Sequence, residues 1–547
     1  MNVDLSQAVR GRVGFGSLVL QWVIHTERQA YRLSGLESSS DGSGLVLTTS
    51  QGEGWDGSLT DAIRASIHLL PRERSLQSRV QVRHPQRVSV VKTVMQGLPD
   101  GVLRTVGGEG GLRVGARHRA MEYPSEWATP FLWLQPDDPG SPRFVARCVA
   151  DPIARRAFSA RCRPAGDTEL ILYEETHAPR YGHGFEGSLW HLGPTQALLG
   201  ELDAHGRELG RVRGLVPVEE RPEASGWVRS CNLVVKMHGM DFNGLVHLDF
   251  DGMARALREL SRHGDLHRTL AHIVGWDGAY MRDCPSLCPA PELGGEAGLR
   301  QLVNTIHSLG GKVILHLNPV AATAARARAE GYAAAQAAGL DGESDTYPAV
   351  DINNDGFIEG GWVLLNPWFA DYRGHLVGHC RELLERYRLD GFYLADTHLF
   401  VGDPRGDYYC GWRALVDELR QIRRGIVLVA EGGADYVPAL SPIFEPRCRA
   451  DAPLFQLTIG RWGRSVAYSG TADAHNRAGV RELRHAQYRP LKGVSRNIIP
   501  AIALVRETLD GDLSDVFIGM EWARNWDALY GEDQREVVPT PGAAEVR

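Results

Sequence analysis

Residues 389–398 read Leu-Asp-Gly-Phe-Tyr-Leu-Ala-Asp-Thr-His, a short apolar run that ends in a carboxylate at Asp396. Residues 426–433 repeat the pattern as Ile-Val-Leu-Val-Ala-Glu-Gly-Gly, with the carboxylate at Glu431. Uninterrupted apolar runs of this length are typical of parallel strands that are buried on both faces. The spacing between the two carboxylates accommodates one helix, so we predict that they end adjacent strands of a parallel sheet.

Strand and helix patterns alternate on both sides of this stretch, from residue 229 to about residue 530. One helix is indicated by Leu299, Leu302, Val303 and Ile306, which recur at helical spacing before the apolar run 312–317. A further, Ala-rich helix is expected over residues 321–338. Repeated strand–helix units predict a (β/α)8 TIM-type barrel, with a doubly wound sheet as the alternative. No strand is followed by Gly-x-Gly-x-x-Gly or a Walker A motif, which favours the barrel.

The first part of the chain has a different pattern. Over residues 1–228, β-branched and other apolar residues come in short alternating runs between Gly, Pro, Asp and Ser, without sustained helical periodicity. We therefore predict a multidomain protein. An all-β sandwich over residues 1–228 precedes the barrel over residues 229–530, and residues 531–547 form a disordered tail.

Composition and charge exclude several classes of protein. The chain has 547 residues, and its 60 basic and 67 acidic side chains give a net charge of −7, which offers no basic excess for a nucleic-acid partner. No apolar run is long enough for a membrane helix. The pair Cys284 and Cys288 has no second pair to complete a zinc site. The N-terminus lacks a signal-peptide pattern, which favours a cytoplasmic protein, although a chain from which an export signal had been trimmed would look the same.

The candidate site follows from the barrel, because catalytic groups of such barrels lie where strands end. Adjacent strands are about 4.8 Å apart, close to the separation of roughly 5–5.5 Å between the carboxyl groups of a retaining glycosidase. In this interpretation Asp396 is the nucleophile and Glu431 the general acid and base. The alternative is a pair of helix N-caps or ion pairs. Seven further residues at strand ends are candidates for substrate binding: Trp276, Asp277, His316, Asn318, His398, Asp473 and His475.

The segment 390–396 resembles the fourth-strand nucleophile segment of retaining α-glycosidases, including the α-amylase superfamily and endo-α-N-acetylgalactosaminidases. In those families an acid Glu ends the fifth strand, and Glu431 matches that position. The stretch 275–280, Gly-Trp-Asp-Gly-Ala-Tyr, is similar to an uncharacterised bacterial family of glycoside-hydrolase-like barrels. The resemblance spans about residues 245–480 and implies action on an α-linked sugar without an organic cofactor. The chain departs from the α-amylase pattern at Leu394, where those enzymes have Arg.

Three functions remain open at this point. The leading one is a retaining glycoside hydrolase, in which Asp473 competes with Glu431 for the acid role, because some α-glycosidase families use a later Asp. The second is a metal-dependent hydrolase built from His316, His398, His475 and Asp473, which is disfavoured because the chain has no His-Glu-x-x-His motif. The third is a catalytically silent carbohydrate-binding protein.

Residues 351–359 read Asp-Ile-Asn-Asn-Asp-Gly-Phe-Ile-Glu and match the start of a calcium-binding loop of the EF-hand type. Asp351, Asn353 and Asp355 would supply side-chain oxygens, and Phe357 a backbone carbonyl. Position 12 of the motif is Trp362 rather than the usual Glu, so the alternative is an Asn- and Gly-rich turn. A bound calcium ion would be structural.

We expect calcium to raise the melting temperature of the chelator-treated protein, because an ion that binds only the folded state stabilises it. Replacement of both Asp351 and Asp355 by Ala should abolish that rise in a thermal denaturation assay. Identical melting curves with and without calcium would leave the turn as the interpretation.

Overall fold

The computed structural model describes residues 3–40, 42, 44–107, 111–115, 119–240, 244–278, 288–343, 362–468, 495–504 and 514–530. The chain divides into two compact units. The first unit contains Met1–Arg213, Ala338–Glu343 and Leu399–Asp407, and the second unit contains the remainder. The first segment of this unit ends 15 residues before the predicted boundary at residue 228, and two segments from later in the chain also belong to the unit.

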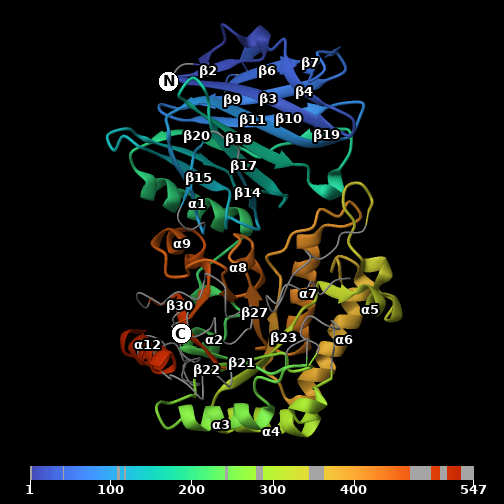
Figure 1. The fold of residues 1–547 in the computed structure, drawn as a ribbon, viewed down its shortest axis with the longest axis vertical. Coiled ribbons are helices and arrows are strands. Elements are labelled where there is room, and N and C mark those ends of the chain that lie inside the picture. The colour runs from blue at the N-terminus through green and yellow to red at the C-terminus, as the bar shows by residue number, and fades with distance from the viewer. Residues whose placement is uncertain are drawn as a thin grey trace, which may run out of the picture. The chain divides into compact units, whose positions relative to one another are not determined.

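Two ten-stranded sheets with antiparallel pairing dominate the first unit (Figure 1). The first sheet has the order β14 (Arg119–Tyr123), β17 (Arg156–Cys162), β18 (Thr168–Glu175), β11 (Val88–Leu98), β3 (Leu18–Thr26), β4 (Ala30–Ser34), β7 (Gln51–Gly54) and β8 (Leu59–Thr60), while β2 (Val13–Phe15) joins β3 to β1 (Val3–Asp4). The second has the order β13 (Leu112–Arg113), β12 (Gly101–Thr105), β15 (Phe131–Pro136), β16 (Arg143–Arg147), β20 (Trp190–Thr195), β10 (Leu76–Arg83), β9 (Arg64–Pro71), β6 (Leu45–Thr49) and β5 (Glu37–Ser40), with β19 (Gly184–Glu186) beside β10. Fully buried aromatic side chains such as Trp22, Trp127 and Phe131 form part of the core.

One helix of this region was not expected from the sequence. The 16-residue helix α1 (Leu198–Arg213) belongs to the first unit, so the prediction that residues 1–228 lack helices is wrong. Its buried side contains Leu202 and Leu209 but also His205 and two glycines. His205 lies 2.7 Å from the hydroxyl of Thr129. Because His and Gly take the place of apolar residues on this side, the helical pattern is hidden in the sequence.

Eight parallel strands close into a barrel in the second unit, which confirms a parallel barrel over a doubly wound sheet. Strand β30 pairs with β21 and closes the ring. In barrel order the strands are β21 (Leu233–His238), β22 (Thr269–Val274), β23 (Lys312–Leu317), β26 (Gly391–Leu394), β27 (Val427–Glu431), β28 (Ile443–Glu445), β29 (Arg464–Tyr468) and β30 (Ile498–Leu504).

Helices lie between these strands along the chain (Figure 1). They are α3 (Phe250–Leu260), α4 (Gly295–Ser308), α5 (Ala324–Ala329), α6 (Ala370–Tyr387), α7 (Tyr408–Ile422), α8 (Val437–Leu440) and α9 (Pro453–Thr458), with α2 (Gly226–Ser230) before the barrel and α12 (Ser514–Tyr530) after it. The apolar positions predicted for α4, among them Leu299, Leu302 and Ile306, are buried. Their spacing therefore predicted both the helix and its buried face correctly.

The Ala-rich segment after β23 is not the single helix that its composition predicts. Residues Ala321–Thr323 form β24, which pairs with β25 (Trp362–Leu364), and only then does the short helix α5 begin. Ala321 and Ala322 are completely buried. The high helix propensity of alanine amounts to a few tenths of a kcal/mol per residue, so burial and strand pairing override it.

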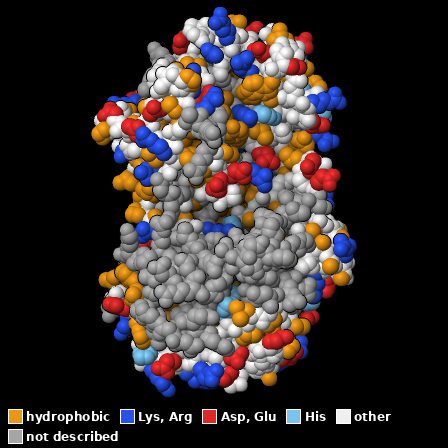
Figure 2. All heavy atoms as spheres, in the orientation of Figure 1, with side chains coloured by type: hydrophobic (Ala, Val, Ile, Leu, Met, Phe, Trp, Pro, Cys, Tyr) orange, Lys and Arg blue, Asp and Glu red, His pale blue; other side chains and the backbone are white. Residues whose placement is uncertain are grey.

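Charged side chains of both signs are interspersed over the described part of the face drawn in Figure 2, and that part of this face shows no large basic patch. Within the described ranges, no helix combines the length and the apolar character that crossing a membrane requires.

We expect the start of helix α3 to depend on one carboxylate. The side chain of Asp249 accepts a hydrogen bond from the backbone N–H of Gly252 at 2.7 Å, whereas Asp251 forms only an exposed ion pair with Arg255. Replacement of Asp249 by Ala should lower the free energy of unfolding by about 1 kcal/mol, since an N-cap is lost. Replacement of Asp251 by Ala should cost less than about 0.5 kcal/mol in the same chemical denaturation experiment. Equal effects of the two substitutions would contradict the capping role.

Candidate active site

Asp396 lies two residues after β26 in a backbone conformation that few residues adopt. Its φ of 59° is left-handed, a region that a non-glycine residue enters at an energetic cost. The side chain is buried, with 3% exposed. The side-chain amide of Asn318, which follows β23, donates a hydrogen bond to Oδ2 of Asp396 at 2.8 Å. The amide is itself oriented, because Oδ1 of Asn318 accepts from the backbone N–H of Val320.

Glu431 is the last residue of β27, the strand beside β26. Its Oε2 accepts a hydrogen bond from the backbone N–H of Asp396 at 2.8 Å. The hydroxyl of Thr397 donates to the carbonyl oxygen of Glu431. Two hydrogen bonds therefore join the segment that follows β26 to the last residue of β27. Strand adjacency therefore brings together the two carboxylates that the sequence analysis singled out.

Arg447, which follows β28, contacts both carboxylates. Its Nη2 and Nε donate to Oε1 of Glu431 at 2.8 and 3.1 Å, and Nη2 lies 3.8 Å from Oδ1 of Asp396. The sequence analysis did not identify this residue. The only available signal was its position just after a strand, in the sequence Phe-Glu-Pro-Arg.

The charges around Glu431 decide its protonation. Burial by itself would raise the pKa of Glu431, but the guanidinium of Arg447, the ring of His398 and the backbone N–H of Asp396 together hold it well below its usual range. Glu431 is therefore ionised at neutral pH while Arg447 is bound to it. A carboxyl group that donates a proton must instead be neutral, so an acid role requires Arg447 to move away from Glu431.

His398 completes this group of side chains. One ligand-type atom each from Asp396, His398 and Glu431 lie within 4.8 Å of one another, close enough to hold a metal ion. The positively charged guanidinium of Arg447 already lies beside both carboxylates. Gly432 makes room for His398, because a Cβ at residue 432 would collide with the histidine and its φ of +109° also favours glycine.

Two other predicted residues have structural contacts instead. Trp276 is only 1% exposed and its indole N–H donates to the carbonyl oxygen of His316, so it has no exposed ring face for a sugar. His316 lies within 3.2 Å of His272 and its ring stacks on Tyr393. Burial and the nearby Lys236 lower the pKa of His316 to about 3, so it is neutral at physiological pH. Direct sugar binding by Trp276 is therefore corrected to a packing role.

A buried ion pair inside the barrel was also missed. Lys236 on β21 lies 3.6 Å from Glu445, the last residue of β28, and both side chains are almost fully buried. The Glu445 carboxylate also accepts a hydrogen bond from the hydroxyl of Tyr468. Burial raises the pKa of Glu445, and the nearby charge of Glu431 raises it further, against the opposing effect of Lys236.

Of the remaining residues predicted for substrate or calcium binding, the structure describes Asp277 and leaves the others outside the described ranges. Asp277 directly follows Trp276 and is half-buried beyond the end of β22. Asp473 and His475 lie outside the described residues, as does the calcium-type loop with Asp351, Asn353, Asp355 and Phe357.

The chain has matches among solved structures, whereas no family model and no curated protein matches it. It is similar to the α-N-acetylgalactosaminidase NagBb from Bifidobacterium bifidum in complex with GalNAc, with 14% identity and a TM-score of 0.65 over 95% of this chain and 91% of that chain. The ligand-free form of that enzyme aligns over 94% and 93%, with 14% identity and a TM-score of 0.58. A GH36 α-galactosidase, AgaA from Geobacillus stearothermophilus, aligns over 94% and 76%, with 11% identity and a TM-score of 0.47.

At this level of identity the likeness to NagBb establishes a shared fold. The coarse resemblance to α-glycosidase barrels is therefore supported. None of these three structures is named as an α-amylase or as an endo-acting enzyme.

The lowered pKa of Glu431 predicts a particular pH dependence of stability. Because the folded-state pKa lies below the ordinary value of 4.5, the ionised group stabilises the fold above that pH, and this stabilisation is lost as the pH falls. Replacement of Arg447 by Gln should make the loss of melting temperature between about pH 6 and about pH 4 smaller by about 2 °C. The control Arg449→Gln removes a different ion pair, to Asp451, and should leave that loss unchanged. Equal pH slopes in the wild type and Arg447→Gln would contradict the assigned cause.

Proposed function

We propose that this protein is a retaining glycoside hydrolase that acts on an α-linked sugar. The observation that carries the proposal is the pair of carboxylates at the ends of adjacent parallel barrel strands, joined through the backbone N–H of Asp396 and bridged by Arg447. The fold shared with an α-N-acetylgalactosaminidase supports the same class of reaction.

Asp396 is the proposed nucleophile. It is oriented by the amide of Asn318 and by the charge of Arg447, and its strained backbone aims the carboxylate from a fixed position. Oδ1 or Oδ2 would attack the anomeric carbon while the glycosidic oxygen leaves, giving a covalent glycosyl ester that water then hydrolyses. Two displacements at one carbon retain its configuration.

Glu431 is the proposed general acid and base, in competition with Asp473. For Glu431 to give a proton to the leaving oxygen, substrate must first draw the Arg447 guanidinium away, which would allow the pKa of Glu431 to rise. Formation of the ester at Asp396 removes the negative charge of that residue. Once Glu431 has given up its proton, it is the single carboxylate of the pair with which Arg447 can interact. Asp473 is the alternative proton donor if Arg447 stays on Glu431 throughout.

For the substrate we infer an α-galactoside or an α-N-acetylgalactosaminide, on the strength of the fold shared with NagBb and the GalNAc bound in that structure. Asp277, His398 and His475 are the proposed partners of the sugar hydroxyls. We also propose that residues 229–530 contain all the reacting groups, that residues 1–228 contribute none, and that no organic cofactor takes part. Calcium at residues 351–357 and a cytoplasmic location remain proposals.

A metal-dependent hydrolase is the second candidate, because Asp396, His398 and Glu431 offer three ligand atoms close together. A metal ion there would have to displace Arg447. Activity that survives exhaustive chelation would exclude this candidate, and activity that is lost with the chelator and restored by a transition-metal ion would favour it.

We expect Asp396→Ala and Glu431→Gln each to lower turnover of 4-nitrophenyl α-galactoside or α-N-acetylgalactosaminide by about a thousandfold or more. Added azide should restore activity to Asp396→Ala, because a small anion can attack where the carboxylate is missing, and the product should have inverted configuration. Asp417→Asn, an exposed carboxylate on α7, is the control and should retain wild-type turnover.

Near-normal turnover in Asp396→Ala would overturn the proposed nucleophile. Near-normal turnover in Glu431→Gln, together with inactive Asp473→Asn, would transfer the acid role to Asp473.

A further inference from the structure

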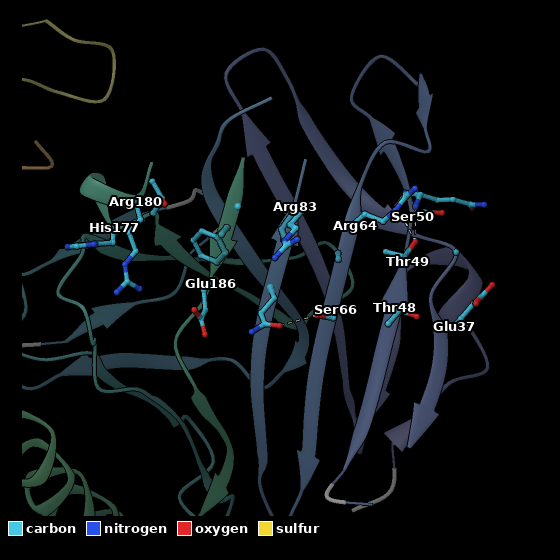
Figure 3. A pocket seen from close by; sticks show the side chains of 18 of the residues that line it. Glu37, Thr48, Thr49, Ser50, Arg64, Ser66, Arg83, His177, Arg180 and Glu186 are labelled. Carbon is cyan, nitrogen blue, oxygen red and sulfur yellow. Dashed lines mark hydrogen bonds between the residues drawn. The ribbon is translucent and has the colours of Figure 1, made fainter. Parts of the chain in front are cut away.

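The first unit contains a polar groove that the proposed reaction does not use. It has a volume of about 820 Å³ and is lined by side chains of β5, β6, β9, β10 and β19 and of the segment that follows β18 (Figure 3). All of its lining residues belong to the first unit, whereas Asp396 and Glu431 belong to the second.

Strand register explains why the floor of the groove is polar. A single row of directly paired residues crosses five strands and contains Glu186, Gln81, Ser66, Thr48 and Glu37. Side chains alternate between the two faces of a strand, so all five lie on the same face while their neighbours, such as Val82 and Ala65, are buried. The row offers hydroxyl and amide groups in the middle and a carboxylate at each end.

Two arginines lie in the next row of the same face. Arg83 on β10 is directly paired with Arg64 on β9, and Figure 3 shows both of them above Ser66 in this view. Like charges directly opposite each other on neighbouring strands destabilise a sheet. Among the described residues, neither guanidinium has a carboxylate within ion-pair distance. Arg64 is held in place because it donates to the backbone carbonyl oxygens of Asp61 and Ile63.

The wall of the groove adds another positive charge. Arg180 lines it and, like the arginine pair, has no carboxylate partner among the described residues. His177 beside it is fixed by Asp407, 2.9 Å away. An adjoining cavity of about 500 Å³ shares Arg64 and Arg83 with the groove, so the arginine pair lies where the two cavities meet.

We propose that this groove is a second binding site, for an acidic oligosaccharide. An anionic group of the ligand, a sulfate or a carboxylate, would bind between Arg64 and Arg83 and relieve their repulsion, because guanidinium groups bind such anions through paired hydrogen bonds. Sugar hydroxyls would donate to Glu37 and Glu186 and bond to Thr48, Ser66 and Gln81.

The two carboxylates and the size of the site select this class of ligand. Glu37 would repel a nucleic acid or a polyacidic peptide, whose charges repeat along the whole chain. Both Glu37 and Glu186, which lies 3.7 Å from Arg79, can accept hydrogen bonds from hydroxyl groups. The two joined cavities accommodate a chain of sugars rather than a single inorganic anion.

The test measures binding by the full-length protein with isothermal titration calorimetry at about 0.1 M salt. The probes are a κ-carrageenan disaccharide, which carries one sulfate and no carboxylate, and a xylotriose with a single glucuronic acid branch, which carries one carboxylate and no sulfate. We expect the wild type to bind at least one of them, and the double variant Arg64→Gln/Arg83→Gln to bind it about tenfold or more weakly. The preferred probe identifies the anionic group.

Two variants serve as controls. Arg74→Gln removes the same charge from the exposed turn between β9 and β10, outside the groove, and should change affinity less than about twofold. Asp396→Ala should bind like the wild type, which separates this site from the barrel and from the outcome of the proposed function. The double variant loses the hydrogen bonds of Arg64 to the carbonyl oxygens of Asp61 and Ile63 but also a like-charge repulsion, so we expect its melting temperature to stay close to that of the wild type. A melting curve that matches the wild type shows that weaker binding does not come from unfolding.

Five results would overturn the proposal. The first four are no binding of either acidic probe, equal binding by wild type and double variant, equal binding of a neutral glucan oligosaccharide, and tighter binding of a polyglutamate peptide. Loss of binding in Asp396→Ala would likewise place the ligand in the barrel and refute a separate site.

Discussion

The site depends on one interaction, the contact of the Arg447 guanidinium with two carboxylates that approach each other closely. Asp396 and Glu431 are buried to different degrees but share the same small volume, and two such groups cannot both remain ionised without a compensating charge. Arg447 supplies that charge. It keeps Glu431 ionised through two hydrogen bonds to that carboxylate and also lies 3.8 Å from Asp396, so the arginine governs the protonation state of Glu431.

The barrel brings these three residues together by strand order alone. Asp396 follows β26, Glu431 ends β27 and Arg447 follows β28, three consecutive strands of the closed sheet. The left-handed backbone at Asp396 turns its N–H toward Glu431, and the absence of a side chain at Gly432 leaves space for His398. Because each residue is attached to the end of a rigid strand, the separation of the carboxylates is set by the spacing of strands rather than by loop conformation.

The sequence predicted those parts of the site that follow a strand with a recognisable apolar pattern. The apolar runs before Asp396 and Glu431 are uninterrupted, so the two strand ends and their adjacency could be inferred. Arg447 could not, because β28 has only three residues and gives no periodic signal. Trp276 was assigned to sugar binding from its residue type, but only coordinates reveal that its ring is buried. Helix α1 was missed because glycine and histidine occupy its buried side, and the segment 321–338 was misjudged because strand pairing outweighed alanine's helix propensity.

The proposed mechanism requires that Asp396 forms a covalent bond to the sugar. The most direct measurement is peptide mapping by mass spectrometry after incubation with a fluorinated α-galactosyl or α-N-acetylgalactosaminyl substrate whose glycosyl-enzyme hydrolyses slowly. We expect one added glycosyl group, located on the peptide that contains Asp396. A label on Glu431 instead, or turnover with inversion of configuration and no label at all, would contradict it.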